Sequence, residues 1–177
     1  QAADYLPADG NQEKVMAHIK YGKEGLELDI TPVSRWYDDG SEEPCVEYEI
    51  GLYYKDTPLF SDEFAEKFVA LKDAQAPYLS AFILNVLANG QPDNWIMLEP
   101  KVSVFMAPKN ALGCACRGEM PGQTPFFMEI KLDQNILADK PYTEYSDTGL
   151  ALKLEASREQ WGQFARDLEN EETDFED

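Results

Sequence analysis

Two segments early in the chain alternate apolar and polar residues with the period of a half-buried strand. Residues 26–30 read Leu-Glu-Leu-Asp-Ile, and residues 46–54 alternate again and are rich in strand-forming side chains. Between them, residues 36–41 form a turn cluster with Asp39-Gly40, in which the glycine accepts a positive φ at little cost. We therefore predict that the two strands pair in a hairpin.

Helical spacing marks two segments in the middle of the chain. Ser61, followed by two acids, predicts a helix start, and apolar residues at 64, 68 and 71 fall on one face before Pro77 interrupts. From Pro77 onward, apolar residues recur at helical spacing up to residue 87, and Asn89-Gly90 supplies a stop. The second segment is the more regular amphipathic helix.

The end of the chain predicts a capped helix followed by a tail. Ser157 and Gln160 have the spacing of a capping box, and apolar residues at 161, 164, 165 and 168 share one face. Residues 169–177 carry six acids in nine positions. We predict that this acidic C-terminal tail is frayed or disordered.

Further short apolar runs predict the remaining strands, at residues 127–132 and 150–154. The runs at 95–98 and 102–106 predict either two short strands or one strand bent at Pro100. The fold class is therefore α+β, with an antiparallel β-sheet of about five to six strands packed with two to three helices, including a C-terminal helix. Regular alternation of strands and helices is missing from the sequence, which argues against a doubly wound parallel sheet.

The length of 177 residues, with 44% hydrophobic residues, suits one domain that folds without disulfides or metals. We expect a flexible N-terminal arm at residues 1–14, a single α+β domain at 15–168 and the acidic tail at 169–177. The arm does not have the basic and then apolar pattern of a signal peptide. No apolar run reaches 18 residues, so the sequence predicts no membrane span.

The net charge of −19 limits the kinds of partner. Nucleic acid and anionic membrane surfaces carry the same sign, so direct binding to either is not expected. Two interpretations of the acidity have about equal weight. One is solubility alone, and the other is recognition of a basic protein, because complementary charge speeds association and selects partners.

Candidate catalytic and metal-binding residues are few. His18 is the only histidine and has no motif around it, so we interpret it as an ordinary surface or edge residue. Cys114 and Cys116 could hold a soft metal if the fold added Cys45 and His18, but loop thiols, reduced in the cytoplasm, are the favoured interpretation. Glu99 follows an apolar run and is interpreted as a strand-end acid in water. We therefore assign no catalytic, cofactor-binding or metal residue.

Aromatic residues beside acids suggest a binding face instead. Tyr and Trp next to carboxylates make good contacts for Arg and Lys, although half of these rings could simply cover the core. Tyr142 and Tyr145 belong to the same class of turn aromatics. The predicted partner-binding residues are Trp36, Tyr37, Asp38, Asp39, Glu42, Glu43, Glu47, Glu49, Tyr53 and Tyr54.

Part of the chain resembles a known family. Residues 77–106 run from an amphipathic helix through the turn Asn89-Gly90 to an apolar strand ending in Leu98-Glu99-Pro100, with a further strand at 102–106. The strand at 150–154 leads into an acidic helix. These features resemble immunity proteins of bacterial polymorphic toxin systems, in particular the Wap-type class. The resemblance implies a cytoplasmic protein that neutralises a toxin domain by binding it, with no catalysis and no cofactor.

Three functions follow from these observations. The leading one is a non-catalytic acidic protein that inhibits a basic, nuclease-like toxin or another cationic protein. The second is a nucleic-acid mimic that inhibits a DNA- or RNA-binding protein, which requires carboxylates in a linear double track. The third is an enzyme that uses Glu99 with another carboxylate, or a metal held by Cys114 and Cys116.

Overall fold

The computed structural model describes residues 17–21, 25–66, 68–95, 102–112, 124–133 and 149–174. Strands and helices alternate irregularly along this part of the chain. In order, its elements are β1 (His18–Tyr21), β2 (Leu26–Trp36), β3 (Cys45–Tyr54), β4 (Thr57–Pro58), α1 (Asp62–Ala65), β5 (Val69–Lys72), α2 (Leu79–Asn89), β6 (Asp93–Trp95), β7 (Val102–Pro108), a 3₁₀ helix (Lys109–Leu112), β8 (Phe126–Asp133), β9 (Gly149–Ala156) and α4 (Arg158–Asp174).

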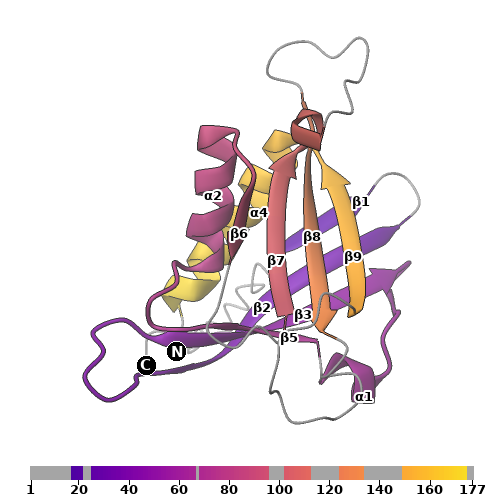
Figure 1. Ribbon diagram of the computed structural model, residues 1–177. Helices are drawn as coiled ribbons and strands as arrows, with labels where there is room; N and C mark the ends of the chain where they lie inside the picture. Colours follow the sequence, from indigo (N-terminus) through magenta and orange to yellow (C-terminus); the bar gives the residue numbers. More distant parts are fainter. Residues whose placement is uncertain are drawn as a thin grey trace, which may run out of the picture.

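The strands form two antiparallel sheets rather than one (Figure 1). The first has the order β1-β2-β3-β4, with β5 also paired to β3, and the second has the order β6-β7-β8-β9. The α+β class and the C-terminal helix are confirmed. The sequence could not reveal the division, because it depends on helix α2, which carries the chain from the first sheet to the second.

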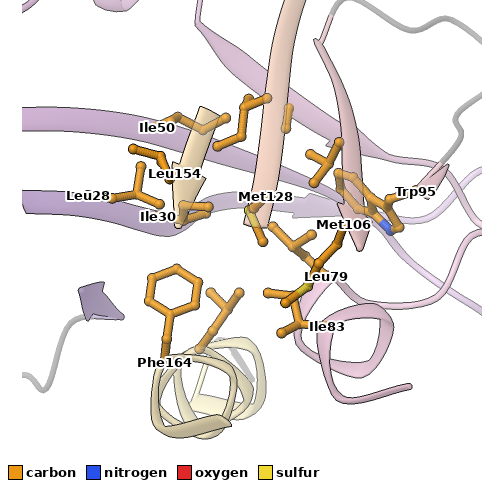
Figure 2. Close-up of a cluster of buried hydrophobic side chains, with 14 of the residues drawn as sticks. Leu28, Ile30, Ile50, Leu79, Ile83, Trp95, Met106, Met128, Leu154 and Phe164 are labelled. Carbon is orange, nitrogen blue, oxygen red and sulfur yellow. The ribbon is translucent and has the colours of Figure 1, made fainter. Parts of the chain in front are cut away.

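One core joins both sheets and the two long helices. Figure 2 shows Leu28, Ile30 and Ile50 of the first sheet facing Met106, Met128 and Leu154 of the second, with Leu79, Ile83 and Phe164 closing the cluster from α2 and α4. Trp95 and Trp161 are almost completely buried. Each indole N–H donates to a backbone carbonyl, of Pro77 at 2.8 Å and of Phe126 at 3.0 Å, so neither polar group is left unsatisfied.

The predicted hairpin is confirmed. β2 and β3 pair antiparallel from Leu26↔Tyr54 to Trp36↔Cys45, with a register shift between Pro32 and Ser34. The alternation works as expected, since Leu28 and Ile30 are buried while Asp29 and Thr31 on the other face are half-buried. The side of β3 that carries Glu47 and Glu49 therefore forms the outer face of the sheet.

Helix α2 is also confirmed between its predicted signals. Its C-cap is Gly90 at φ 62°, and the Gly90 amide donates to the Val86 carbonyl.

The helix predicted to begin at Ser61 is much shorter than expected. Ser61 does cap the short helix α1, but the chain then turns into β5, which pairs with β3. The helical spacing of apolar residues at 64, 68 and 71 was misleading, because strand pairing and burial of Ala70 and Lys72 decide the conformation there.

The prediction of a frayed or disordered acidic tail is wrong for residues 169–174. Helix α4 continues to Asp174, and Glu171 and Glu172 are only 4% and 6% exposed. The helix persists because these two carboxylates are hydrogen-bonded in the interior. The capping box is confirmed, since the Gln160 amide donates to Ser157 Oγ at 3.1 Å and the Ser157 amide donates to Gln160 Oε1 at 3.0 Å.

Several predictions fall outside the described residues. These are the arm at residues 1–14, the last three residues of the tail, and the apolar run after Trp95. Five single residues fall there as well: Glu99, Cys114, Cys116, Tyr142 and Tyr145. Among the helices that are described, none combines the length and the apolar character needed to cross a membrane.

Candidate functional site

The structure separates the ten predicted binding residues into three groups. Strand β3 runs from Cys45, beside the β2–β3 turn, to Tyr54 at the far end, roughly 30 Å away at about 3.3 Å per residue. Glu47 and Glu49 lie along the strand, and Tyr53 and Tyr54 lie at its far end. The group beside the turn, here called the hairpin tip, consists of Trp36, Tyr37, Asp38, Asp39, Glu42 and Glu43.

The hairpin tip presents two aromatic side chains to solvent. Trp36 is 39% exposed and Tyr37 is 57% exposed, and the loop projects at the left of the molecule in Figure 1. The Tyr37 hydroxyl accepts a hydrogen bond from Arg35 Nη2 at 3.0 Å, and the guanidinium carbon lies 5.6 Å from the Tyr37 ring centroid. Arg35 therefore orients the more exposed of the two rings.

All four acids of the hairpin tip are exposed, and the loop that carries them is ordered by its own hydrogen bonds. The Ser41 amide donates to the Asp38 carbonyl at 3.0 Å, and Ser41 Oγ donates to the Glu43 carbonyl at 2.8 Å. Gly40 has φ 83°, which glycine adopts without strain. Four negative charges are therefore held within six residues of a preorganised turn.

Two residues beneath the turn fix its base. The ammonium of Lys72, on β5, donates to the Pro44 carbonyl at 2.7 Å and lies 5.0 Å from the Tyr78 ring centroid. Burial lowers the pKa of Lys72 from its ordinary value, against the nearby charge of Glu43. The Cys45 thiol donates to Asp38 Oδ2 at 3.4 Å, and burial together with Asp38 raises the pKa of that thiol. The hairpin tip thus rests on a buried support.

The other predicted residues do not join this group. Glu47 is half-buried and accepts a hydrogen bond from Ser34 Oγ at 2.9 Å, whereas Glu49 is exposed. Tyr54 is 41% exposed, with the Lys55 ammonium 5.1 Å from its ring centroid. Tyr53 is half-buried, and its ring lies so close to Gly51 that a Cβ there would meet it at 2.7 Å.

His18 lies on the outer face of the first sheet, in agreement with its predicted place at an edge. Its Nδ1 is 2.8 Å from Asp29 Oδ1, and its Nε2 is 3.7 Å from Glu27 Oε2. The Lys20 ammonium is 2.6 Å from Glu27 Oε1. These two acids on the outer face are therefore already paired within the chain.

The metal set that would combine His18 with Cys45 is not formed. His18 pairs with Asp29, which pairs with Gly51, and Gly51 is six residues from Cys45 on β3, roughly 20 Å away at about 3.3 Å per residue. Within the described ranges, no group of three or more His, Cys, Asp and Glu residues is arranged to hold a metal ion.

Sequence reasoning missed a buried carboxylate cluster where α4 meets the N-terminus of α2. Glu172 Oε1 accepts hydrogen bonds from Tyr48 Oη at 2.7 Å and from the Ser80 amide at 3.3 Å, and Ser80 Oγ donates to Glu172 Oε2. Glu171 accepts a hydrogen bond from the Ala17 amide. Since Tyr78 provides no side-chain cap, Glu172 serves as a distant cap for α2.

Burial shifts the titration of this cluster. Desolvation raises the pKa of the Glu172 carboxyl above its ordinary value of 4.5, although the hydrogen bonds from Ser80 and Tyr48 oppose the rise. Desolvation also raises the pKa of Tyr48, with the Glu172 charge adding to the effect. The cluster is closed to solvent, so its role on this geometry is to fasten α4 to α2 and β3.

Glu172→Gln is expected to change how stability depends on pH. The folded pKa lies above the unfolded one, so the stability that this proton contributes is complete below about pH 4.5 and is lost as pH rises through the folded pKa. The glutamine variant keeps the shape and has no such loss. Urea unfolding between pH 4.5 and 7 should therefore show the variant gaining stability relative to the original chain as pH rises.

Glu159→Gln is the matched control, because Glu159 is exposed on the same helix and does not contribute to the pKa shift of Glu172. It should leave the pH dependence of the urea midpoint unchanged. A constant difference between Glu172→Gln and the original chain at every pH would contradict the effect of burial on this carboxyl.

Comparison with protein-family models, curated proteins and solved structures finds no match for this chain. The resemblance to immunity proteins of toxin systems therefore remains a prediction from the sequence.

Proposed function

We propose that this chain is a non-catalytic, acidic binding protein of the bacterial cytoplasm that inhibits a basic protein, such as a nuclease-like toxin domain. The observation that carries the proposal is the hairpin tip. Exposed Trp36 and Tyr37 lie beside four exposed acids on a turn ordered by internal hydrogen bonds.

The physical chemistry of this surface suits a cationic partner. Trp and Tyr supply large contact area at a small cost in side-chain entropy, and they dominate binding energy where they enter a partner's pocket. Acids around them favour Arg and Lys on the partner and exclude acidic competitors. A net charge of −19 adds long-range attraction that accelerates encounter with a basic protein.

The arrangement of acids favours protein recognition over mimicry of nucleic acid. A mimic requires carboxylates in two linear tracks along its surface. On the outer face of the first sheet, Glu27 and Asp29 are already paired with Lys20 and His18. Four of the five exposed acids of the predicted site gather instead in one turn, at Asp38, Asp39, Glu42 and Glu43, and the fifth, Glu49, lies along β3. A compact patch of this kind supports the proposal.

The experiment compares two affinity columns loaded with an extract of the native host. One carries the chain, and the other carries a variant with Asp38, Asp39, Glu42 and Glu43 replaced by asparagine or glutamine. We expect a basic protein to bind the first column, to elute as salt increases, and to be retained much less by the second. Equal retention by both columns, or the absence of any basic protein from the eluate, would overturn the proposal.

A further inference from the structure

Within the described part of the chain, strand β9 is paired along one edge only. It pairs with β8 along all eight residues, from Gly149↔Asp133 to Ala156↔Phe126, with no register shift, and no described strand pairs with its other edge. β9 is far less covered than the inner strands β7 and β8. Its exposed residues are Gly149, Leu150, Ala151, Lys153 and Glu155.

The remaining strand edges in the described part of the chain have features that discourage pairing with another chain. β1 and β5 have four residues each and β6 has three, while β4 has two and contains Pro58. The part of β2 that does not pair with β1 contains Pro32 and a register shift. Short length, proline and bulges are the usual protections of an edge. β9 is long, regular and without proline, so it is the edge best suited to accept a strand.

We propose that β9 pairs antiparallel with β9 of a second copy of this chain, about a two-fold axis at Leu154. In this register, Lys153 of each copy lies opposite Glu155 of the other, so two pairs of opposite charge form on one face. An axis at Lys153 would place two lysines opposite each other, and an axis at Leu152 would place Lys153 opposite Ala151. The charges of β9 therefore select the register at Leu154, since like charges directly opposite are destabilising.

Both charged side chains already lie on the outer face of the second sheet. The Lys153 ammonium is 4.1 Å from the Phe127 ring centroid, and Glu155 Oε1 is 2.8 Å from the Lys109 ammonium. These contacts hold the two side chains on the face where the pairs would form. In Figure 1, β9 is the right-hand strand of the second sheet, and the hairpin tip lies at the left of the molecule. The proposed dimer surface and the hairpin tip are therefore separate.

Added salt should strengthen this self-association, whereas it should weaken binding of a basic partner. Each copy carries a net charge of −19, so the copies repel at long range. Raising the salt concentration from about 0.01 M to about 0.15 M shortens the Debye length from about 30 Å to about 8 Å, which screens this repulsion but spares contacts at close range. The inference does not rest on the proposed function, and its failure would leave that function untouched.

Sedimentation velocity of the full chain over a range of concentrations is the test. We expect a monomer–dimer equilibrium that is tighter at about 0.15 M salt than at about 0.01 M. At the higher salt, Lys153→Glu and Glu155→Lys should each weaken the dimer about tenfold, and the double variant K153E/E155K should restore it. Lys55→Glu is the matched control for Lys153→Glu, because it makes the same change in net charge at an exposed position away from β9.

A chain that stays monomeric at every concentration and salt would overturn the proposal. The proposal would also be overturned if a dimer forms but Lys153→Glu weakens it no more than Lys55→Glu does. Circular dichroism of each variant establishes whether it is folded. If a single variant fails to fold, the folded double variant carries the test, and the proposal is overturned if that variant does not dimerise.

Discussion

Replacing Trp36 and Tyr37 together by alanine is expected to weaken binding of the basic partner by about 30-fold or more, which corresponds to about 2 kcal/mol. The two rings supply most of the apolar area of the hairpin tip, and exposed aromatic side chains of this kind are the usual anchors of an interface. The free energy of unfolding should change little, since neither ring belongs to the buried core. Isothermal titration calorimetry with the isolated partner, together with urea unfolding, measures both quantities.

The far end of strand β3 offers a matched control. Tyr54 and Leu59 are 41% and 49% exposed, so Tyr54→Ala/Leu59→Ala removes a similar amount of exposed apolar surface. This control should bind with unchanged affinity. If it weakens binding as much as the hairpin-tip variant does, or if the hairpin-tip variant binds normally, then the hairpin tip is not the binding surface.

Replacing Glu171 and Glu172 together by alanine is expected to destabilise the chain by about 3 kcal/mol. The change leaves three buried donors without their acceptor, namely the Tyr48 hydroxyl, the Ser80 hydroxyl and the Ser80 amide, and it also removes the acceptor of the Ala17 amide. Each unsatisfied buried group costs about 1–3 kcal/mol, partly offset because two buried carboxylates are removed as well. Urea unfolding at neutral pH measures the loss.

Glu169→Ala/Asp174→Ala is the control for this second result. Both residues are exposed on the same helix, so the variant removes the same number of acids without touching the interior. Its stability should stay within about 0.5 kcal/mol of the original chain. Equal stability of the two double variants would show that the end of α4 is the solvated tail that its sequence suggests.

The hairpin, α2 and the start of α4 could be predicted because their signals are local. Asp39-Gly40, Asn89-Gly90 and the pair Ser157 and Gln160 each act within a few residues. The end of α4 could not be predicted, because its burial depends on distant partners. Tyr48 is 124 residues from Glu172 in sequence, and Ser80 is 92 residues away. A run of acids therefore resembled a solvated tail.

The grouping of residues 36–43 could also be predicted, because its signals are local. Acids and aromatics within residues 36–43 stay together because one turn holds them. Tyr53 and Tyr54 resemble them in composition, but the length of β3 places them at the other end of the strand. Local chemistry thus grouped residues of similar composition, and only the register of the sheet could show which of them lie together on one surface.

The central claim is that the acidic hairpin tip binds a basic protein. The most direct test is the dissociation constant of the purified complex between about 0.05 M and about 0.5 M salt, measured for the chain and for the variant with Asp38, Asp39, Glu42 and Glu43 neutralised. We predict that affinity falls steadily as salt rises and that neutralising the four acids makes this fall less steep. An affinity that does not depend on salt, or a dependence that is the same in the variant, would contradict the claim.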